Sequence, residues 1–114
     1  MMEEHANLAN EVCTACQVGA PKVSKEESVS LLETLPEWTL LDESIPKLFR
    51  QFKFDNFVQA MAFANKAGEL AESLGHHPKI VLEWGSVEVY WWTHKIAGLH
   101  RNDFISAAKT DALF

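Results

Sequence analysis

The stretch FVQAMAFANKAGELAESLGHHP, residues 57–78, decides the fold. Its apolar residues recur at helical spacing, which predicts a long helix from Phe57 to about Leu74. Gly75 is typical of the position just after a helix, and Pro78 prevents the helix from resuming. We expect Asp55 to be the N-cap. The expected buried stripe consists of Phe57, Ala60, Met61, Ala64, Ala67, Ala71 and Leu74.

The chain before this helix predicts one shorter helix and two strands. Ser24 to Glu27 fits a capping box, and a short helix follows it. Pro36 ends this helix because the residue before a proline is pushed out of the helical region. Residues 38–41 and 47–54 then read as strands joined by a turn at 42–44. The apolar stripe expected on the short helix consists of Val29, Leu31, Leu32 and Leu35.

The chain after the long helix predicts a hairpin and a final helix. Residues 80–84 and 87–94 read as its strands, with Gly85-Ser86 in the turn. The final helix is expected from about Arg101 to Leu113. In the second strand, Val87, Val89, Trp91 and Thr93 share the core face, and Glu88, Tyr90, Trp92 and His94 share the other. The predicted class is α+β: a four-stranded antiparallel sheet with helices packed on one face, in the order α-β-β-α-β-β-α.

Length and charge restrict the class of protein. The chain has 114 residues, the length of a single domain. Its net charge of −6 argues against a nucleic-acid-binding surface. No apolar run approaches the roughly 18 residues of a membrane span. The start of the chain is acidic and lacks the layout of a secretory signal, so we expect a cytoplasmic protein. We divide it into an arm, residues 1–22, and a domain, residues 23–114.

The arm contains a Cys-x-x-Cys pair, Cys13 and Cys16. Such a pair is half of a structural zinc site, or a redox pair where it opens a helix after a strand. A structural zinc site uses four ligands, and only His5 lies nearby in the sequence. Two ordinary reduced thiols are the simplest interpretation.

A group of ionisable residues follows the long helix. Glu72 and His76 are four residues apart, so they would face each other if the last helical turn extends that far. His77 follows directly, and His94 lies near the end of the predicted hairpin. Imidazole titrates near neutral pH, so this group predicts proton transfer. Two alternatives remain: the histidines merely end a helix, or they form a zinc site with Glu72.

Three further features have both a structural and a functional interpretation. Asp103, early in the last helix, is either a first-turn residue favoured by the helix dipole or a site residue. His100 is expected at the surface. Tyr90 and Trp92 form either a solvated strand face or a contact with another subunit.

At these residues the chain resembles the pterin-4a-carbinolamine dehydratase family. The resemblance extends from about Pro36 to Asp111 and leaves out the arm. It rests on Glu72-x-x-x-His76-His77-Pro78, Trp84, His94, Gly98-Leu99, Arg101-Asn-Asp103, Trp38 and Phe52-x-Phe54-x-x-Phe57. The resemblance implies a hydro-lyase that converts 4a-hydroxytetrahydropterin to quinonoid dihydropterin and so recycles the cofactor of aromatic amino acid hydroxylases.

The resemblance also implies the residues of the site. His76, His77 and His94 would be the acid–base set, with Glu72 orienting, and neither a metal nor a bound cofactor is implied. Which histidine is acid and which is base stays open. The expected substrate-binding residues are Gly75, His76, His77, Pro78, Thr93, His94, Lys95 and Asp103.

The resemblance implies partners as well. Family members form homodimers or homotetramers, which suits the Tyr90 and Trp92 face, and a contact with an aromatic amino acid hydroxylase is an expected further partner. The alternative is a non-catalytic dimerisation or assembly partner on the same scaffold.

Overall fold

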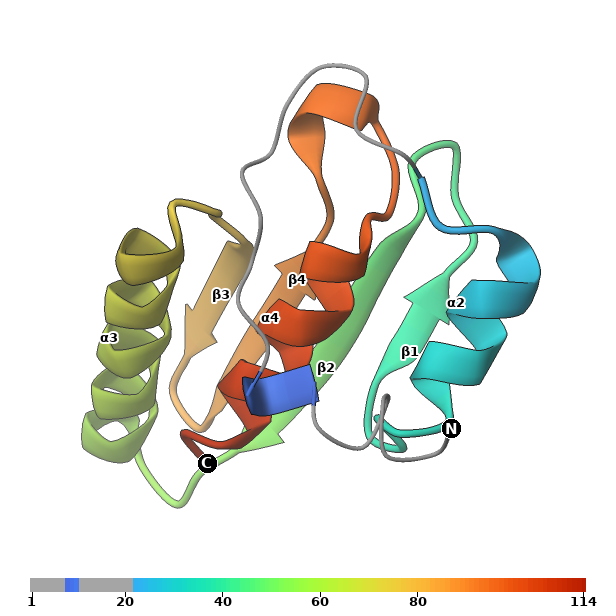
Figure 1. Cartoon of the computed structure of the whole chain (residues 1–114). Helices are drawn as coiled ribbons and strands as arrows, with labels where there is room; N and C mark the ends of the chain where they lie inside the picture. The colour runs from blue at the N-terminus through green and yellow to red at the C-terminus, as the bar shows by residue number, and fades with distance from the viewer. Residues whose placement is uncertain (1–7, 11–21) are drawn as a thin grey trace.

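A four-stranded antiparallel sheet with helices on one face forms the protein, as the computed structural model in Figure 1 shows. The structure describes residues 8–10 and 22–114. The strands are β1 (Thr39–Leu41), β2 (Lys47–Lys53), β3 (Lys79–Glu83) and β4 (Ser86–Trp91), in the spatial order β1-β2-β4-β3. The helices are α2 (Lys25–Leu32), α3 (Phe57–Leu74) and α4 (Arg101–Asp111), with short 3₁₀ turns η1 (Leu8–Asn10) and η2 (His94–Ile96). The predicted α+β class is therefore confirmed.

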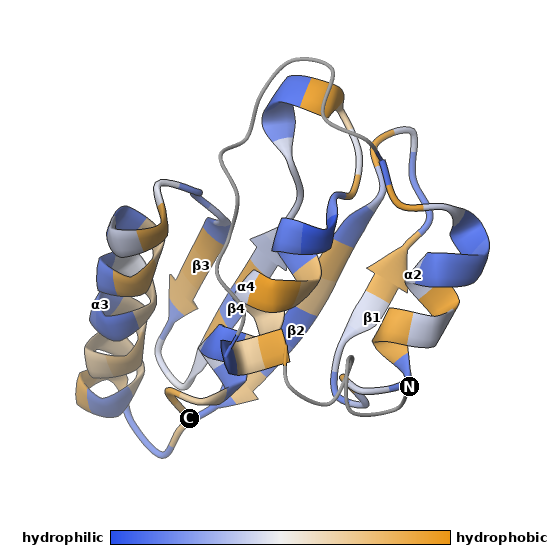
Figure 2. Ribbon diagram, viewed as in Figure 1, coloured by the Kyte–Doolittle hydropathy of each residue, from blue (hydrophilic) through white to orange (hydrophobic). Residues whose placement is uncertain are grey.

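The core lies between the sheet and the helices. On β2 and β4, alternate side chains point toward the helices, and the register pairs Leu48 with Trp91 and Phe52 with Val87. All four of these side chains are buried, as period-two alternation requires when one face of a sheet is covered. The edge strand β3 is hydrophobic through its middle and hydrophilic at both ends (Figure 2).

Helix α3 has the predicted span, but it begins and packs differently. Asn56, and not Asp55, is the N-cap, because the Asn56 side chain accepts a hydrogen bond from the backbone N–H of Gln59 at 2.9 Å. A carboxylate one residue earlier would lie too far from that amide. Phe57 and Met61, both predicted to be buried, are 42% exposed. The helix instead packs on the sheet with a stripe rotated toward Ala60, Phe63, Ala67 and Ala71.

Helix α2 has the predicted cap, and its stripe is only partly as expected. Ser24 accepts a hydrogen bond from the backbone N–H of Glu27 at 3.0 Å. Leu31 and Leu35 are buried, whereas Val29 is exposed. The face of α2 that meets the core carries Ser28 and Leu31, three residues apart, and Val29 points away from it.

The hairpin differs from the expectation at both of its ends. Glu83 pairs with Ser86, so the two-residue turn is Trp84-Gly85 rather than Gly85-Ser86. Strand β4 ends at Trp91, and the chain closes a tight turn through a bridge between Thr93 and Gly98. His94 is consequently in η2 and not at the end of the predicted strand. The alternating pattern of residues 87–94 does not show where the strand ends.

Helix α4 ends at Asp111, two residues before the predicted end, and ties the sheet to the helical layer. The Asp111 carboxylate accepts hydrogen bonds from Trp38 Nε1 at 2.9 Å and from Arg50 at 2.7 Å. On the other side of α4, Leu8 of η1 is buried, and the Lys109 amine donates to the carbonyl of Ala9 at 2.7 Å. Part of the predicted arm thus packs on the domain.

The boundary between arm and domain stays a prediction. Cys13, Cys16 and His5 lie outside the described residues. In the part of the chain that the structure describes, none of the helices combines the length and the apolar character that a membrane crossing requires.

Candidate active site

The backbone at Gly75 separates the two adjacent histidines. Gly75 adopts a left-handed conformation (φ 63°), its N–H donates to the carbonyl of Glu72, and the N–H of His76 donates to that of Ala71. These two bonds are the Schellman arrangement that ends a helix. The chain turns sharply there, so His76 is directed into the protein and is 4% exposed, whereas the His77 side chain is 61% exposed.

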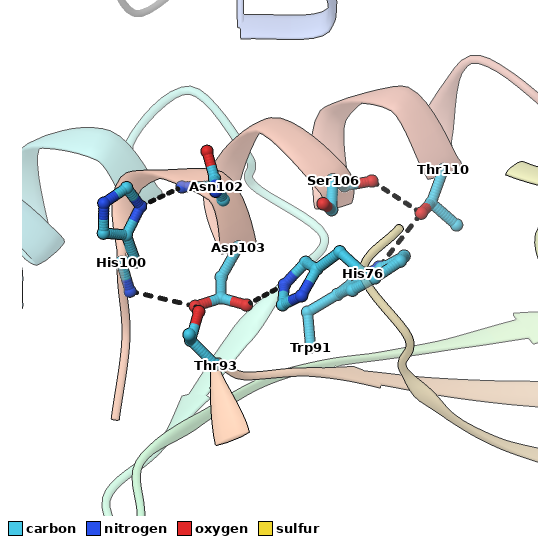
Figure 3. Close-up of polar contacts among 8 residues, drawn as sticks. All are labelled: His76, Trp91, Thr93, His100, Asn102, Asp103, Ser106 and Thr110. Carbon is cyan, nitrogen blue, oxygen red and sulfur yellow. Dashed lines mark hydrogen bonds and ion pairs between the residues drawn. The ribbon is translucent and has the colours of Figure 1, made fainter. Parts of the chain in front are cut away.

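His76 is paired with Asp103 at the start of α4. The Nε2 atom of His76 lies 2.7 Å from Oδ1 of Asp103, and Asp103 is completely buried (Figure 3). The two residues are 27 positions apart in the sequence. The turn after α3 and the start of α4 are brought together by the packing of both helices on the same face of the sheet.

The Asp103 carboxylate is fixed by two further donors. Its Oδ2 atom accepts from Oγ1 of Thr93 at 2.7 Å and from the backbone N–H of His100 at 2.9 Å. His100 is the N-cap of α4, with Nδ1 accepting from the N–H of Asn102 at 3.0 Å. A carboxylate only accepts hydrogen bonds, so Nε2 of His76 carries the hydrogen in this pair. Asp103 is therefore both a helix-capping residue and part of the candidate site.

The face of the His76 ring is covered by Trp91. The two rings stack with centroids 5.2 Å apart and planes inclined by 29°. Nε1 of Trp91 donates to Oγ1 of Thr110 at 3.0 Å, and Thr110 donates to the carbonyl of Ser106 at 2.7 Å (Figure 3). A buried histidine is thus bounded by β4 on one side and α4 on the other.

His77 has a carboxylate partner of its own. Nε2 of His77 lies 2.6 Å from Oε1 of Glu72, and the Glu72 side chain is 79% exposed. The predicted contact between Glu72 and His76 is wrong. It assumed that the helix continues through His76, but the left-handed Gly75 directs His76 inward and leaves His77 over the last turn.

His94 follows Thr93 directly in the chain, at the start of η2. Its ring contacts Trp92 with centroids 4.5 Å apart, and its side chain is exposed, as is that of Lys95. Thr93 is completely buried and bonds to Asp103. The predicted residues thus divide into a buried group (His76, Thr93, Asp103), an exposed pair (Glu72, His77) and a third position at η2 (His94, Lys95).

Sequence reasoning missed three residues around the buried group: Trp91 and Thr110, which are buried, and His100, which is partly buried. Trp91 was expected in the core but not against a histidine, and Thr110 was not singled out. His100 was expected at the surface, although His100-x-x-Asp103 has the spacing of a capping box, and that signal could have identified it.

The described residues do not form the zinc site considered from the sequence. Residues 8–10 and 22–114 contain no group of three or more His, Cys, Asp or Glu side chains that could hold a metal ion. The carboxylates that could serve as ligands are paired with different histidines, Glu72 with His77 and Asp103 with His76.

A cavity of about 320 Å³ lies next to this region without including its histidines. It is bounded by the start of α2, the β1–β2 turn and residues 97–99, and two lysines, Lys22 and Lys25, line it. The predicted site residues do not appear among its described lining residues, so the cavity is not the candidate site.

The uncovered face of the sheet carries the aromatic residues expected there. Tyr90 packs against Phe49 with centroids 4.9 Å apart, and the amine of Lys79 lies 4.9 Å from the centre of the Tyr90 ring. The Tyr90 hydroxyl donates to Glu88 at 2.8 Å. This hydrogen bond, followed by burial and by the charge of Glu88, raises the pKa of Tyr90 above its ordinary value of 10.0.

Comparison with known proteins gives one consistent family. The family model described as Pterin 4 alpha carbinolamine dehydratase matches residues 21–113. A protein of Saccharophagus degradans named "Putative pterin-4-alpha-carbinolamine dehydratase" is 53% identical over 95% of this chain and 96% of its own length. A protein of Marinobacter nauticus with the same name is 54% identical over 96% of this chain and 99% of its own.

Two solved structures share the fold. A transcriptional coactivator/pterin dehydratase from Brucella melitensis is 30% identical, with a TM-score of 0.76 over 82% of this chain and 98% of that chain. A pterin dehydratase-like protein identified as a RuBisCO assembly factor in the alpha-carboxysome is 28% identical, with a TM-score of 0.59 over 68% of this chain and 88% of that chain.

Proposed function

The chain belongs to the pterin-4-alpha-carbinolamine dehydratase family and is a hydro-lyase of that kind. We propose that it dehydrates 4a-hydroxytetrahydropterin by histidine acid–base catalysis. A carbinolamine carries its hydroxyl group on the carbon next to a ring amine. Loss of water therefore needs one proton delivered to the departing hydroxyl and one proton removed from the ring nitrogen. The product is quinonoid dihydropterin.

The observation that carries this proposal is that two adjacent histidines have separate carboxylate partners. His76 and Asp103 form a buried pair, and His77 and Glu72 form an exposed pair. A dehydration needs two proton transfers at neighbouring positions of one substrate, and histidine is suited to both because it titrates near neutral pH. Two oriented imidazoles on consecutive residues supply these groups within one small region.

We assign different duties to the two pairs. His77 is exposed and paired with an exposed carboxylate, so it exchanges protons with solvent between turnovers. His76 is held rigidly by Asp103 and Trp91, which suits a group that must meet one atom of the substrate in a fixed orientation. His94 is the third acid–base residue, at the η2 side of the site.

The substrate-binding residues that we propose surround these histidines. Gly75 and Pro78 flank them in the chain, and Thr93 and Lys95 flank His94. The Asp103 carboxylate accepts three hydrogen bonds from protein donors in a fully buried position. We therefore propose that Asp103 acts through His76 rather than by binding the pterin directly.

The decisive experiment is dehydration of freshly generated 4a-hydroxytetrahydropterin, followed by ultraviolet absorbance with and without a chelator. Rapid turnover that a chelator does not change is the expected result. Absence of turnover by correctly folded protein would overturn the proposal, and loss of turnover with chelator would replace histidine catalysis by a metal-dependent reaction.

We further propose that the reaction recycles the cofactor of an aromatic amino acid hydroxylase in the cytoplasm, and that the chain works as a homodimer or homotetramer. The uncovered sheet face supports the second part, because Phe49 packs against Tyr90 there and Lys47, on the same strand as Phe49, lies over the Trp92 ring. Aromatic residues are enriched where subunits meet.

A second candidate function is an assembly or dimerisation partner. It is favoured by the solved relative whose name describes a RuBisCO assembly factor, since that protein has the same fold. The two functions respond differently to removal of the His77 imidazole. A partner role would survive His77→Ala in a binding assay, whereas dehydration would not.

A further inference from the structure

Trp91 lies directly against His76 in the core of the protein. It is fully buried on β4, with its register partner Leu48 on β2. Its indole ring stacks on the His76 imidazole with centroids 5.2 Å apart and an interplanar angle of 29°. Trp91 thus contacts the imidazole through its ring face, whereas Asp103 contacts it at the Nε2 atom.

A hydrogen bond and a ring contact restrict an imidazole in different ways. The bond between His76 Nε2 and Asp103 Oδ1 fixes the position of one ring atom. The stacked indole of Trp91 restricts the tilt of the imidazole, because a flat surface against the ring face resists rotation of the ring plane. Asp103 and Trp91 therefore both contribute to the orientation of His76.

Thr110 holds Trp91 in turn. Its Oγ1 accepts from Nε1 of Trp91 at 3.0 Å and donates to the carbonyl of Ser106 at 2.7 Å. All three residues are buried, so the indole N–H would lose its partner without the Thr110 hydroxyl. An unsatisfied buried donor is unfavourable enough to make the ring move toward another acceptor. The hydroxyl of Thr110 is thus the point at which the orientation of Trp91 is set.

We propose that Trp91 and Thr110 are positioning residues for His76, with Thr110 orienting the indole and the indole orienting the imidazole. The chain of contacts runs from the last turn of α4 through β4 to the turn after α3 (Figure 3). Neither residue is expected to touch the pterin. The catalytic part of the inference rests on the proposed function, because it requires His76 to transfer a proton.

The first test detects changes in the surroundings of the Trp91 and His76 rings without any substrate. Nuclear magnetic resonance spectra of wild type, Thr110→Ser and Thr110→Val are compared at the Trp91 indole N–H and the His76 ring. Thr110→Ser keeps the hydroxyl and is expected to leave both sets of signals nearly in place. Thr110→Val keeps the shape, loses the hydroxyl and is expected to shift both. Thr34→Val is a matched control, since Thr34 lies just after α2 and its hydroxyl also donates to a backbone carbonyl, that of Leu31 three residues earlier, at 2.7 Å.

The second test is kinetic. Thr110→Val is expected to lower kcat about tenfold while KM changes less than about twofold, because a misdirected catalytic group slows the chemical step more than substrate binding. Thr110→Ser should restore most of the rate. In a His76→Ala background the same Thr110→Val change should lower the rate by less than about twofold, because the group it positions is absent.

Three results would overturn the inference. One is an unchanged His76 ring signal in folded Thr110→Val, and another is the full tenfold loss persisting in the His76→Ala background. Should Thr110→Val not fold, Trp91→Phe keeps an aromatic face and loses the N–H, and an unmoved His76 signal there would be the third. Absence of turnover in wild type would instead reject the proposed function. The spectra would still show whether Thr110 and Trp91 orient the His76 ring.

Discussion

The backbone conformation of Gly75 sets the directions of the two histidines that follow it. Its left-handed backbone places one of two adjacent histidines inside the protein and the other outside. The buried one gains a partner from another helix, Asp103, and the exposed one keeps the partner that its own helix offers, Glu72. Two chemically identical side chains on consecutive residues thereby acquire different surroundings.

At this scale, replacing His77 by alanine should lower turnover by at least about tenfold, because positioned acid–base groups contribute about 10²–10⁴-fold. His77 is exposed, so the fold should persist, and circular dichroism and thermal unfolding check this. Lys66→Ala, on the exposed side of α3, is the control and should keep its rate. Full turnover by folded His77→Ala would remove this residue from the mechanism.

Tyr90 is the single tyrosine of the chain, so its ionisation can be followed directly by the ultraviolet absorbance of tyrosinate. The hydrogen bond to Glu88 raises the pKa of Tyr90, and the titration midpoint should lie above 10.0. Because the folded state holds this proton more tightly, the associated stability is present below the ordinary pKa and is lost as the pH rises through the raised value. Glu88→Gln should move the midpoint back toward 10.0; a midpoint that Glu88→Gln leaves in place would contradict the assignment.

At the scale of elements, the two longer helices meet through their ends. Helix α3 ends at the turn that supplies His76, and α4 begins with the capping box that contains Asp103. The carboxylate that caps α4 also holds the histidine, so one side chain stabilises the helix and orients the site. The start of α4 therefore lies at the candidate site together with His76.

The helix end at Gly75 can be tested by stability. Gly75→Ala places a side chain in a left-handed conformation and should lower the free energy of unfolding by about 1–2 kcal/mol. No atom lies within 4 Å of the added Cβ, so backbone strain alone is measured. Gly68→Ala is the matched control inside α3, where the space is also open, and should raise stability by up to about 1 kcal/mol. Urea unfolding of both variants measures these changes in the free energy of unfolding. Equal changes of the same sign in Gly75→Ala and Gly68→Ala would refute the argument.

At the scale of the whole molecule, the two faces of the sheet have different roles. One face is covered by the helices and directs Trp91 and Thr93 toward His76 and Asp103. The other face carries Phe49, Tyr90 and Trp92, with the amine of Lys47 lying 5.1 Å from the centre of the Trp92 ring. A sheet with one covered and one aromatic face has a surface available for association.

Self-association through this face predicts that Trp92→Glu shifts the protein toward smaller species in sedimentation velocity, because a buried unpaired carboxylate is strongly unfavourable at an interface. Trp84→Glu is the control: Trp84 lies at the tip of the hairpin and is 68% exposed. If Trp92→Glu sediments like wild type, or if only Trp84→Glu dissociates, the interface lies elsewhere.

Local patterns were sufficient for most of the fold. The span of α3, the cap of α2, the two hairpin-forming strand pairs and the inward face of β4 all follow from short-range periodicity, caps and stop signals. The errors at Asp55, at Phe57 and at the Gly85 turn are shifts of one or two residues. Such shifts depend on how a helix rolls on its sheet or on which residue reaches an amide, and these are not local properties.

The sequence by itself determined that His76, His77 and His94 are the candidate proton-transfer residues, because residue type and spacing carry that information. Only the tertiary structure decided their partners. His76 bonds to Asp103 across 27 residues and stacks on Trp91, which Thr110 holds from another element. Partners such as these are created when helices and strands pack together, so no window of the sequence contains them.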